Sequence, residues 1–330
     1  MSIRGIFWNP EQHRLRALWR LILQALVWFL VLVLLQQLTA AVLSALTGGL
    51  AGASIATQQI RGLLLQAIPM LAVVVAVWLG GRFLDRRSFS GFGLHLDRDW
   101  WIDFAFGLVL GLLLMTLIFL VELAAGWGEV VAVFYARPGG LPFLPGILVP
   151  LTSFILVGIT EELWFRGYIL INLAEGFNGR WIGPAGAILL ATLLQAAVFG
   201  VAHALNPNAT AVSTLNLSLA GVFLALGYLL TGELAVPIGL HITWNFAQGN
   251  LFGYEVSGTQ VRVATLLDLE QTGPVLWTGG AFGPEAGLLR IGAMVLGAVL
   301  IFLWVRWRYG RARLKSRIAS PPDGPRRKGA

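Results

Sequence analysis

The sequence predicts an all-α protein, a polytopic transmembrane helical bundle of about eight spans with both termini in the cytoplasm. Of its 330 residues, 57 % are hydrophobic and only 12 % are charged, against about 25 % charged in a typical soluble domain. A soluble protein of this length could not bury so much apolar surface in one core. Cysteine is absent, which excludes a disulfide-stapled secreted domain, a cysteine-ligated metal site and a thiol nucleophile.

Long apolar runs locate the spans, because about 20 apolar residues are needed to cross the hydrocarbon core. Eight runs qualify, at about 21–46, 62–80, 101–125, 144–172, 184–205, 212–231, 234–252 and 287–305. They divide the chain into an N-terminal segment (residues 1–20), a transmembrane domain (21–305) and a basic tail (306–330). We therefore expect a multi-pass protein of the cytoplasmic membrane.

Basic residues give the orientation of these spans. Most of the 23 Lys and Arg residues lie before the first run, between the second and third, after the fourth and after the last. Because cytoplasmic loops are enriched in Lys and Arg, these segments and both termini are predicted to be cytoplasmic. The net charge of +7 is thus a topology signal. Membrane lipid is the expected partner of this charge, and nucleic acid is not.

The two ends of the chain carry further signals. Asn9-Pro10-Glu11 resembles a helix start, with Asn as the cap and Pro in the first turn. An interfacial helix is therefore expected within residues 1–20. The tail is expected to be disordered beyond about residue 310, because it is rich in basic residues and proline. Residues 253–286 form the longest expected external segment.

Some charged residues lie near the ends of the runs. Arg20, Arg61 and Arg290 are expected to extend to water along the membrane surface. Glu122 and Glu233 are expected to be solvated end charges.

The fourth run is different, because it holds Glu161, Glu162 and Arg166 inside an apolar helix. A charge at the bilayer centre costs roughly 2.5–3.5 kcal/mol or more, so such residues are functional candidates. Glu162 and Arg166 are spaced i, i+4 and can form an ion pair. Glu161 points about 100° away from Glu162 and stays free. A free carboxylate in a low-dielectric site can exchange protons near neutral pH. The alternative is an ion cluster that only packs helices together.

Two histidines follow in later runs. His203 closes the fifth run and shares a helix face with Phe199, whose ring can wall its site. His241 shares a face with Asn245 in the seventh run. Glu161, His203 and His241 can bind zinc or another divalent metal. The same groups can equally polarise water without a metal, with nearby donors stabilising an oxyanion.

Helix lengths place these groups at different depths. Glu161, His203 and His241 lie roughly 21, 30 and 12 Å from the cytoplasmic ends of their runs, at 1.5 Å per residue. Tilt, kinks near Pro207 and Pro237, or shifted helix boundaries are needed to bring them to one depth.

The ordered motifs Glu161-Glu162-x-x-x-Arg166, Phe199-x-x-x-His203 and His241-x-x-x-Asn245 resemble those of the CPBP intramembrane proteases. That family includes CAAX prenyl endopeptidases and bacteriocin-processing or immunity proteins. The resemblance covers about residues 140–252, with a weaker echo in residues 91–94.

The resemblance implies an intramembrane endopeptidase that acts on a peptide or membrane-protein substrate. It assigns activation of the water to Glu161 and His203. It assigns stabilisation of the tetrahedral oxyanion, or completion of a metal shell, to His241 and Asn245. Glu162, Arg166 and Phe199 are the implied supporting residues. The family has been described both as metal-dependent and as glutamate-dependent without metal, and both mechanisms stay open here.

Two functions of other classes are also compatible with the sequence. One is a proton- or ion-coupled transporter whose intramembrane acids and histidines form an ion path; against it, the sequence has no paired inverted repeats. The other is a non-catalytic membrane scaffold or immunity protein. The variant Glu161→Gln separates the three functions. It would abolish proteolysis in a protease, change ion flux in a transporter, and leave partner binding intact in a scaffold.

Overall fold

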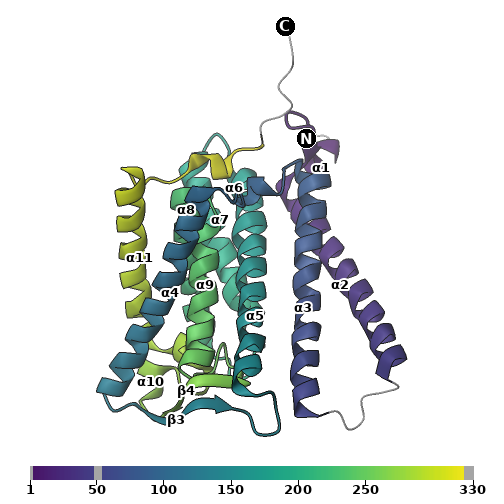
Figure 1. The fold of residues 1–330 in the computed structure, drawn as a ribbon. Coiled ribbons are helices and arrows are strands. Elements are labelled where there is room, and N and C mark those ends of the chain that lie inside the picture. The colour runs from purple at the N-terminus through teal and green to yellow at the C-terminus, as the bar shows by residue number, and fades with distance from the viewer. Residues whose placement is uncertain (1–2, 48–53, 323–330) are drawn as a thin grey trace.

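A computed structural model describes residues 3–47 and 54–322 of the chain. Most of these residues are helical (Figure 1). The helices are α1 (Ile3–Phe7), α2 (Ala17–Thr47), α3 (Ile55–Leu79), α4 (Arg98–Ala124), α5 (Phe143–Glu162), α6 (Ile171–Phe177), α7 (Gly183–Ala202), α8 (Ala211–Thr231), α9 (Ala235–Phe246), α10 (Val275–Thr278) and α11 (Leu288–Tyr309). Within the described residues, seven helical segments are long and apolar enough to cross a membrane. The chain is a multi-pass membrane protein.

The expected span at 234–252 corresponds to α9 and the π-helical turn η4 (Ala247–Leu251) that continues it. It is shorter than the other spans and lies inside the bundle, in contact with α4, α5 and α8 (Figure 1). Every residue from Ala235 to Ile242 is buried. α9 is therefore the central helix around which the others pack.

Glycines let α4 approach α9 closely. A Cβ atom at Gly107 would collide with the carbonyl oxygen of Val236, and one at Gly111 with that of Leu240. On the opposite side, a Cβ at Gly239 would collide with the carbonyl oxygen of Phe104. Small residues spaced by four are typical of closely packed membrane helices. Substitution at these positions would push the two backbones apart.

The end of the bundle opposite α1 is covered by a two-stranded antiparallel sheet (Figure 1). Its strands are β3 (Gly128–Ala136) and β4 (Ala264–Gln271), with Tyr135 opposite Thr265. The segment expected to be external, 253–286, contains β4, α10 and two 3₁₀ turns. It is a folded cap.

The N-terminal segment differs from its prediction. The helix expected to begin at Asn9 does not form, and a small hairpin takes its place, with strands β1 (Trp8–Asn9) and β2 (Arg14–Leu15). The Asn9 side chain accepts hydrogen bonds from the backbone N–H groups of Glu11 and Gln12. Asn commonly closes turns in this way, so the same cap signal was compatible with a turn. A short helix, α1, lies before the hairpin.

The tail is also more ordered than predicted. A 3₁₀ helix, η7 (Ser316–Ala319), packs on α6 and α7 and buries Ile318 and Ala319. The Asn178 side chain donates a hydrogen bond to the carbonyl oxygen of Ala319 at 2.9 Å. The prediction of disorder is therefore wrong for residues 311–322, and the rest of the tail, 323–330, lies outside the described residues.

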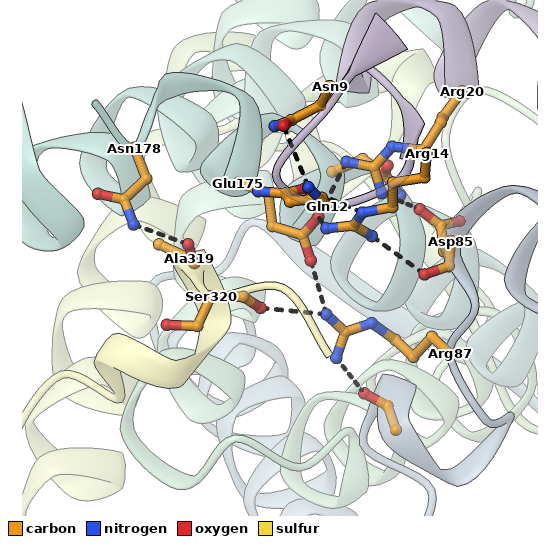
Figure 2. Close-up of polar contacts among 12 residues, drawn as sticks. Asn9, Gln12, Arg14, Arg20, Asp85, Arg87, Glu175, Asn178, Ala319 and Ser320 are labelled. Carbon is orange, nitrogen blue, oxygen red and sulfur yellow. Dashed lines mark hydrogen bonds and ion pairs between the residues drawn. The ribbon is translucent and has the colours of Figure 1, made fainter. Parts of the chain in front are cut away.

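A buried cluster of charges joins both ends of the chain at this side of the bundle (Figure 2). Glu175, on α6, accepts hydrogen bonds from Arg14 at 2.7 Å, Arg20 at 2.9 Å and Arg87 at 2.6 Å. Arg20 also pairs with Asp85. Arg20 is only 2 % exposed, so the expectation that it extends to water is wrong. We call these five residues the arginine cluster.

Candidate active site

Five of the residues singled out by the sequence border one cavity, whereas Glu162 and Arg166 lie behind its wall. It measures about 230 Å³ and lies among α3, α5, α7, α8, α9 and α11. Glu161, His203, His241 and Asn245 line it, and so does Phe199. Helix lengths had placed Glu161, His203 and His241 at different depths. Part of that difference disappears because α9, which carries His241, begins inside the bundle, where Leu234, Ala235 and Val236 are fully buried.

Glu162 connects two of the motifs. It is completely buried, and its Oε1 atom accepts a hydrogen bond from Arg166 Nη1 at 2.8 Å. This confirms the expected ion pair. The same oxygen also accepts a hydrogen bond from His241 Nδ1 at 2.7 Å, a contact that the sequence did not predict. Because Nδ1 is engaged, the imidazole has a fixed orientation and presents Nε2 to Glu161.

Glu161 is the free carboxylate of the pair. Its side chain is 28 % exposed, in contrast to the buried Glu162. Its Oε2 atom lies 3.9 Å from His241 Nε2, which is too long for a direct hydrogen bond. One water molecule about 2.8 Å from both atoms would satisfy ordinary hydrogen-bond lengths.

Phe199 forms the wall between the polar groups. Its ring centroid lies 4.9 Å from that of His203 and 6.4 Å from that of His241. The Arg166 guanidinium carbon lies 4.7 Å from the same ring, a cation–π arrangement. His203 Nδ1 donates a hydrogen bond to the Phe199 carbonyl oxygen at 2.8 Å, which leaves Nε2 as the second hydrogen-bonding atom of the ring.

Two π-helical segments begin next to the site. η3 (Leu163–Leu170) starts directly after Glu162, and η4 starts two residues after Asn245. Such widened turns are rare and frequently occur at functional sites, because they change the direction in which side chains project. Here η3 separates the glutamates from α6, which carries Glu175 of the arginine cluster.

A zinc ion in a protein is held by three or four donor side chains that converge on one point. Among the residues that the structure describes, no group of three His, Asp or Glu side chains could hold a metal ion. Glu161 and His241 face each other, but His203 does not converge with them on one point. The arrangement of donors in this structure therefore does not fit the expected metal set of Glu161, His203 and His241.

Several buried charges differ from expectation. Arg290 is 5 % exposed and lines the cavity, so it does not extend to water, whereas Arg61 is exposed as expected. Glu122 is fully buried, and its Oε2 atom accepts a hydrogen bond from Gln271. Glu233 pairs with His95 and Arg317. Position near the end of an apolar run does not reveal whether other segments cover a charge.

Residues 142–247, which span α5 to the end of α9, match the family model described as type II CAAX prenyl endopeptidase Rce1-like. Through this segment the chain is similar to the family that its motifs resemble. The Rce1-like segment contains all three motifs, and helices and loop residues outside it supply the rest of the cavity. No curated protein and no solved structure matches the chain.

Proposed function

We propose that the protein is an intramembrane endopeptidase that hydrolyses a peptide bond with water activated by side chains. One observation carries the proposal: a free carboxylate, Glu161, faces a histidine held by a second, buried carboxylate, Glu162, in one cavity. The Rce1-like match, whose description names a CAAX prenyl endopeptidase, supports the reaction class. The substrate class is a peptide or a membrane protein.

The first step would be attack by water. Glu161 takes a proton from the water, and the water oxygen forms a bond to the carbonyl carbon of the substrate. The Nε2 lone pair of His203 accepts the second water hydrogen, because its Nδ1 proton is donated to Phe199. Both groups line the same cavity, so they can orient one water molecule.

The second step would be collapse of the tetrahedral intermediate. Asn245 donates from its side-chain amide to the oxyanion, and His241 donates from Nε2 in its doubly protonated form. Glu162 then provides the negative charge that faces His241 Nδ1. When the carbon–nitrogen bond breaks, Glu161 returns its proton to the leaving amine, which balances the reaction.

Hydrolysis of a peptide library by purified protein, read by mass spectrometry, tests the proposal. Glu161→Gln should abolish cleavage, while Glu129→Gln, an exposed glutamate on β3, should leave it unchanged. Cleavage that persists in Glu161→Gln would refute the role of this carboxylate. Wild-type protein that cleaves nothing, but changes ion flux or binds a partner, would favour the transporter or scaffold instead.

Metal analysis of the same preparations tests the metal-free route. We expect cleavage to persist after chelation, with no stoichiometric metal in the wild type. About one zinc per chain that falls in His203→Ala would instead show that the donors rearrange around an ion.

We also propose that the membrane is the cytoplasmic membrane and that both chain termini face the cytoplasm. The chain has no cysteine, so the single variants Glu129→Cys and Arg311→Cys can each be labelled at one known position in intact cells. An impermeant thiol reagent should reach the first position and not the second.

A further inference from the structure

The cavity has a second polar end, formed by elements that the Rce1-like match does not include. Arg290, on α11, and Glu285, just before α11, both line it. Each is at least 95 % buried. A buried guanidinium in a substrate cavity requires an explanation, because burying a charge is costly unless it is paired and hydrogen-bonded.

Arg290 uses few of its five N–H donors. Within the described residues, its one hydrogen bond runs from Nη1 to the backbone oxygen of Glu285 at 3.2 Å. Its Nη2 atom is 4.0 Å from Glu285 Oε1, and its buried Nε atom has no partner. The guanidinium therefore keeps hydrogen-bonding capacity for another acceptor.

Glu285 does not fill that capacity, because its carboxylate is engaged elsewhere. Its Oε2 atom accepts hydrogen bonds from the backbone N–H and the Oγ–H of Ser257. These bonds anchor the carboxylate to the loop before β4. Glu285 stays near enough to offset part of the positive charge, but not in the geometry of a bidentate pair.

Trp244 fixes the place of the guanidinium relative to the proposed catalytic groups. The Arg290 guanidinium carbon lies 5.5 Å from the Trp244 ring. Trp244 follows His241 by three residues on α9, or about 4.5 Å along the helix. Arg290 and His241 also line one cavity, so an extended substrate chain can reach both within a few residues.

We propose that Arg290 is a specificity-determining residue that binds a carboxylate of the substrate a few residues from the cleaved bond. The identity of this ligand rests on the proposed peptidase function, because the anions of an unmodified peptide are carboxylates. A planar guanidinium on an aromatic ring suits bidentate binding of a carboxylate. Two sources are compatible with this chemistry: the C-terminus of the substrate, or an Asp or Glu side chain.

Binding to the Glu161→Gln protein tests the subsite without hydrolysis. Three versions of a peptide that the wild type cleaves are compared: one with a free C-terminus, one amidated, and one amidated with an added Asp a few residues beyond the cleavage site. If the wild type cleaves none, C-terminal fragments of the library serve as probes. The free acid should bind about 10- to 100-fold more tightly than the amide, the range of a lost charge-assisted pair. Recovery of affinity by the Asp peptide shows that a side-chain carboxylate can also occupy the subsite, and no recovery restricts the subsite to the C-terminus. Equal affinity for all three overturns the proposal.

Variants then assign the preference to Arg290. All of these variants are made in the Glu161→Gln background. Arg290→Gln should abolish the preference for acid over amide, and Arg290→Lys should keep part of it. The control Arg61→Gln, at an exposed arginine of α3, should keep all of it. Glu285→Gln should keep or increase it, because a competing negative charge is removed. If Arg290 only pairs with Glu285, both variants would lower stability and leave the ratio of the two affinities unchanged. The acid-to-amide comparison does not need a variant of Arg290, so it stays decisive if that variant fails to fold.

Failure of this inference can be told apart from failure of the proposed function. A wild type that cleaves peptides with no preference for acid over amide contradicts the inference alone. A wild type that prefers to bind acids but hydrolyses nothing contradicts the proposed function alone.

Discussion

Replacing Glu162 by Gln tests how stability and activity are coupled at the site. Glu162 and Arg166 are both completely buried, and removing one partner of a buried pair costs about 3–5 kcal/mol. Arg166 would keep its hydrogen bond to the Gly221 carbonyl oxygen at 3.2 Å and the Phe199 ring at 4.7 Å. We therefore expect a loss near the lower limit, about 3 kcal/mol, or roughly 4 °C in melting temperature for a chain of 330 residues. Hydrolysis should be lost as well.

The double variant Glu162→Gln/Arg166→Met separates the two effects. Replacing a buried ion pair by uncharged, well-packed groups of similar volume is often neutral or stabilising, so the melting temperature should return to within about 1 °C of wild type. Activity should stay at least about 100-fold below wild type, because His241 still faces no carboxylate. Thermal melting in detergent and peptide cleavage are measured on the same preparations. Recovery of cleavage together with stability would refute the reasoning, since Glu162 would then act only as a counter-charge for Arg166.

Three further predictions concern the scaffold. Glu175→Gln leaves the guanidiniums of the arginine cluster short of negative charge. Thermal melting in detergent should show a loss of about 3–5 kcal/mol in the free energy of unfolding, whereas the exposed control Glu129→Gln should melt like wild type. Gly111→Ala should cost about 1–3 kcal/mol and reduce cleavage by moving α9, while Gly292→Ala, where a Cβ meets open space, should change neither. A chain ending at Lys315 removes the buried η7 and should melt at lower temperature than one ending at Pro322; equal melting would show that η7 does not hold the bundle together.

Contacts within one helix were predictable from the sequence. The spacings Glu162–Arg166 and Phe199–His203 put each pair on one face, and the structure confirms the contacts. Helical periodicity is a local property, so it needs no knowledge of the neighbouring helices. The family resemblance followed from the same spacings.

Contacts between helices were not predictable in this way. The hydrogen bond between Glu162 and His241 joins residues on different helices, and it depends on how deeply α9 lies in the bundle. Gly107 and Gly239 allow that position by removing side chains where α4 meets α9. Arg290 was misassigned for the same reason, because its burial depends on the segments around it.

The arginine cluster also has a consequence for biogenesis. Arg14 and Arg20 are made 161 and 155 residues before their shared partner Glu175, which lies near the end of the fourth candidate span. Arg87 further donates to the carbonyl oxygen of Ser320, 233 residues later in the chain. A nascent chain therefore carries uncompensated arginines at the membrane surface until four spans have been made. This side of the bundle can close only after Ser320 has been made, so a chain that stalls before that residue would present an unfinished face to quality-control proteases.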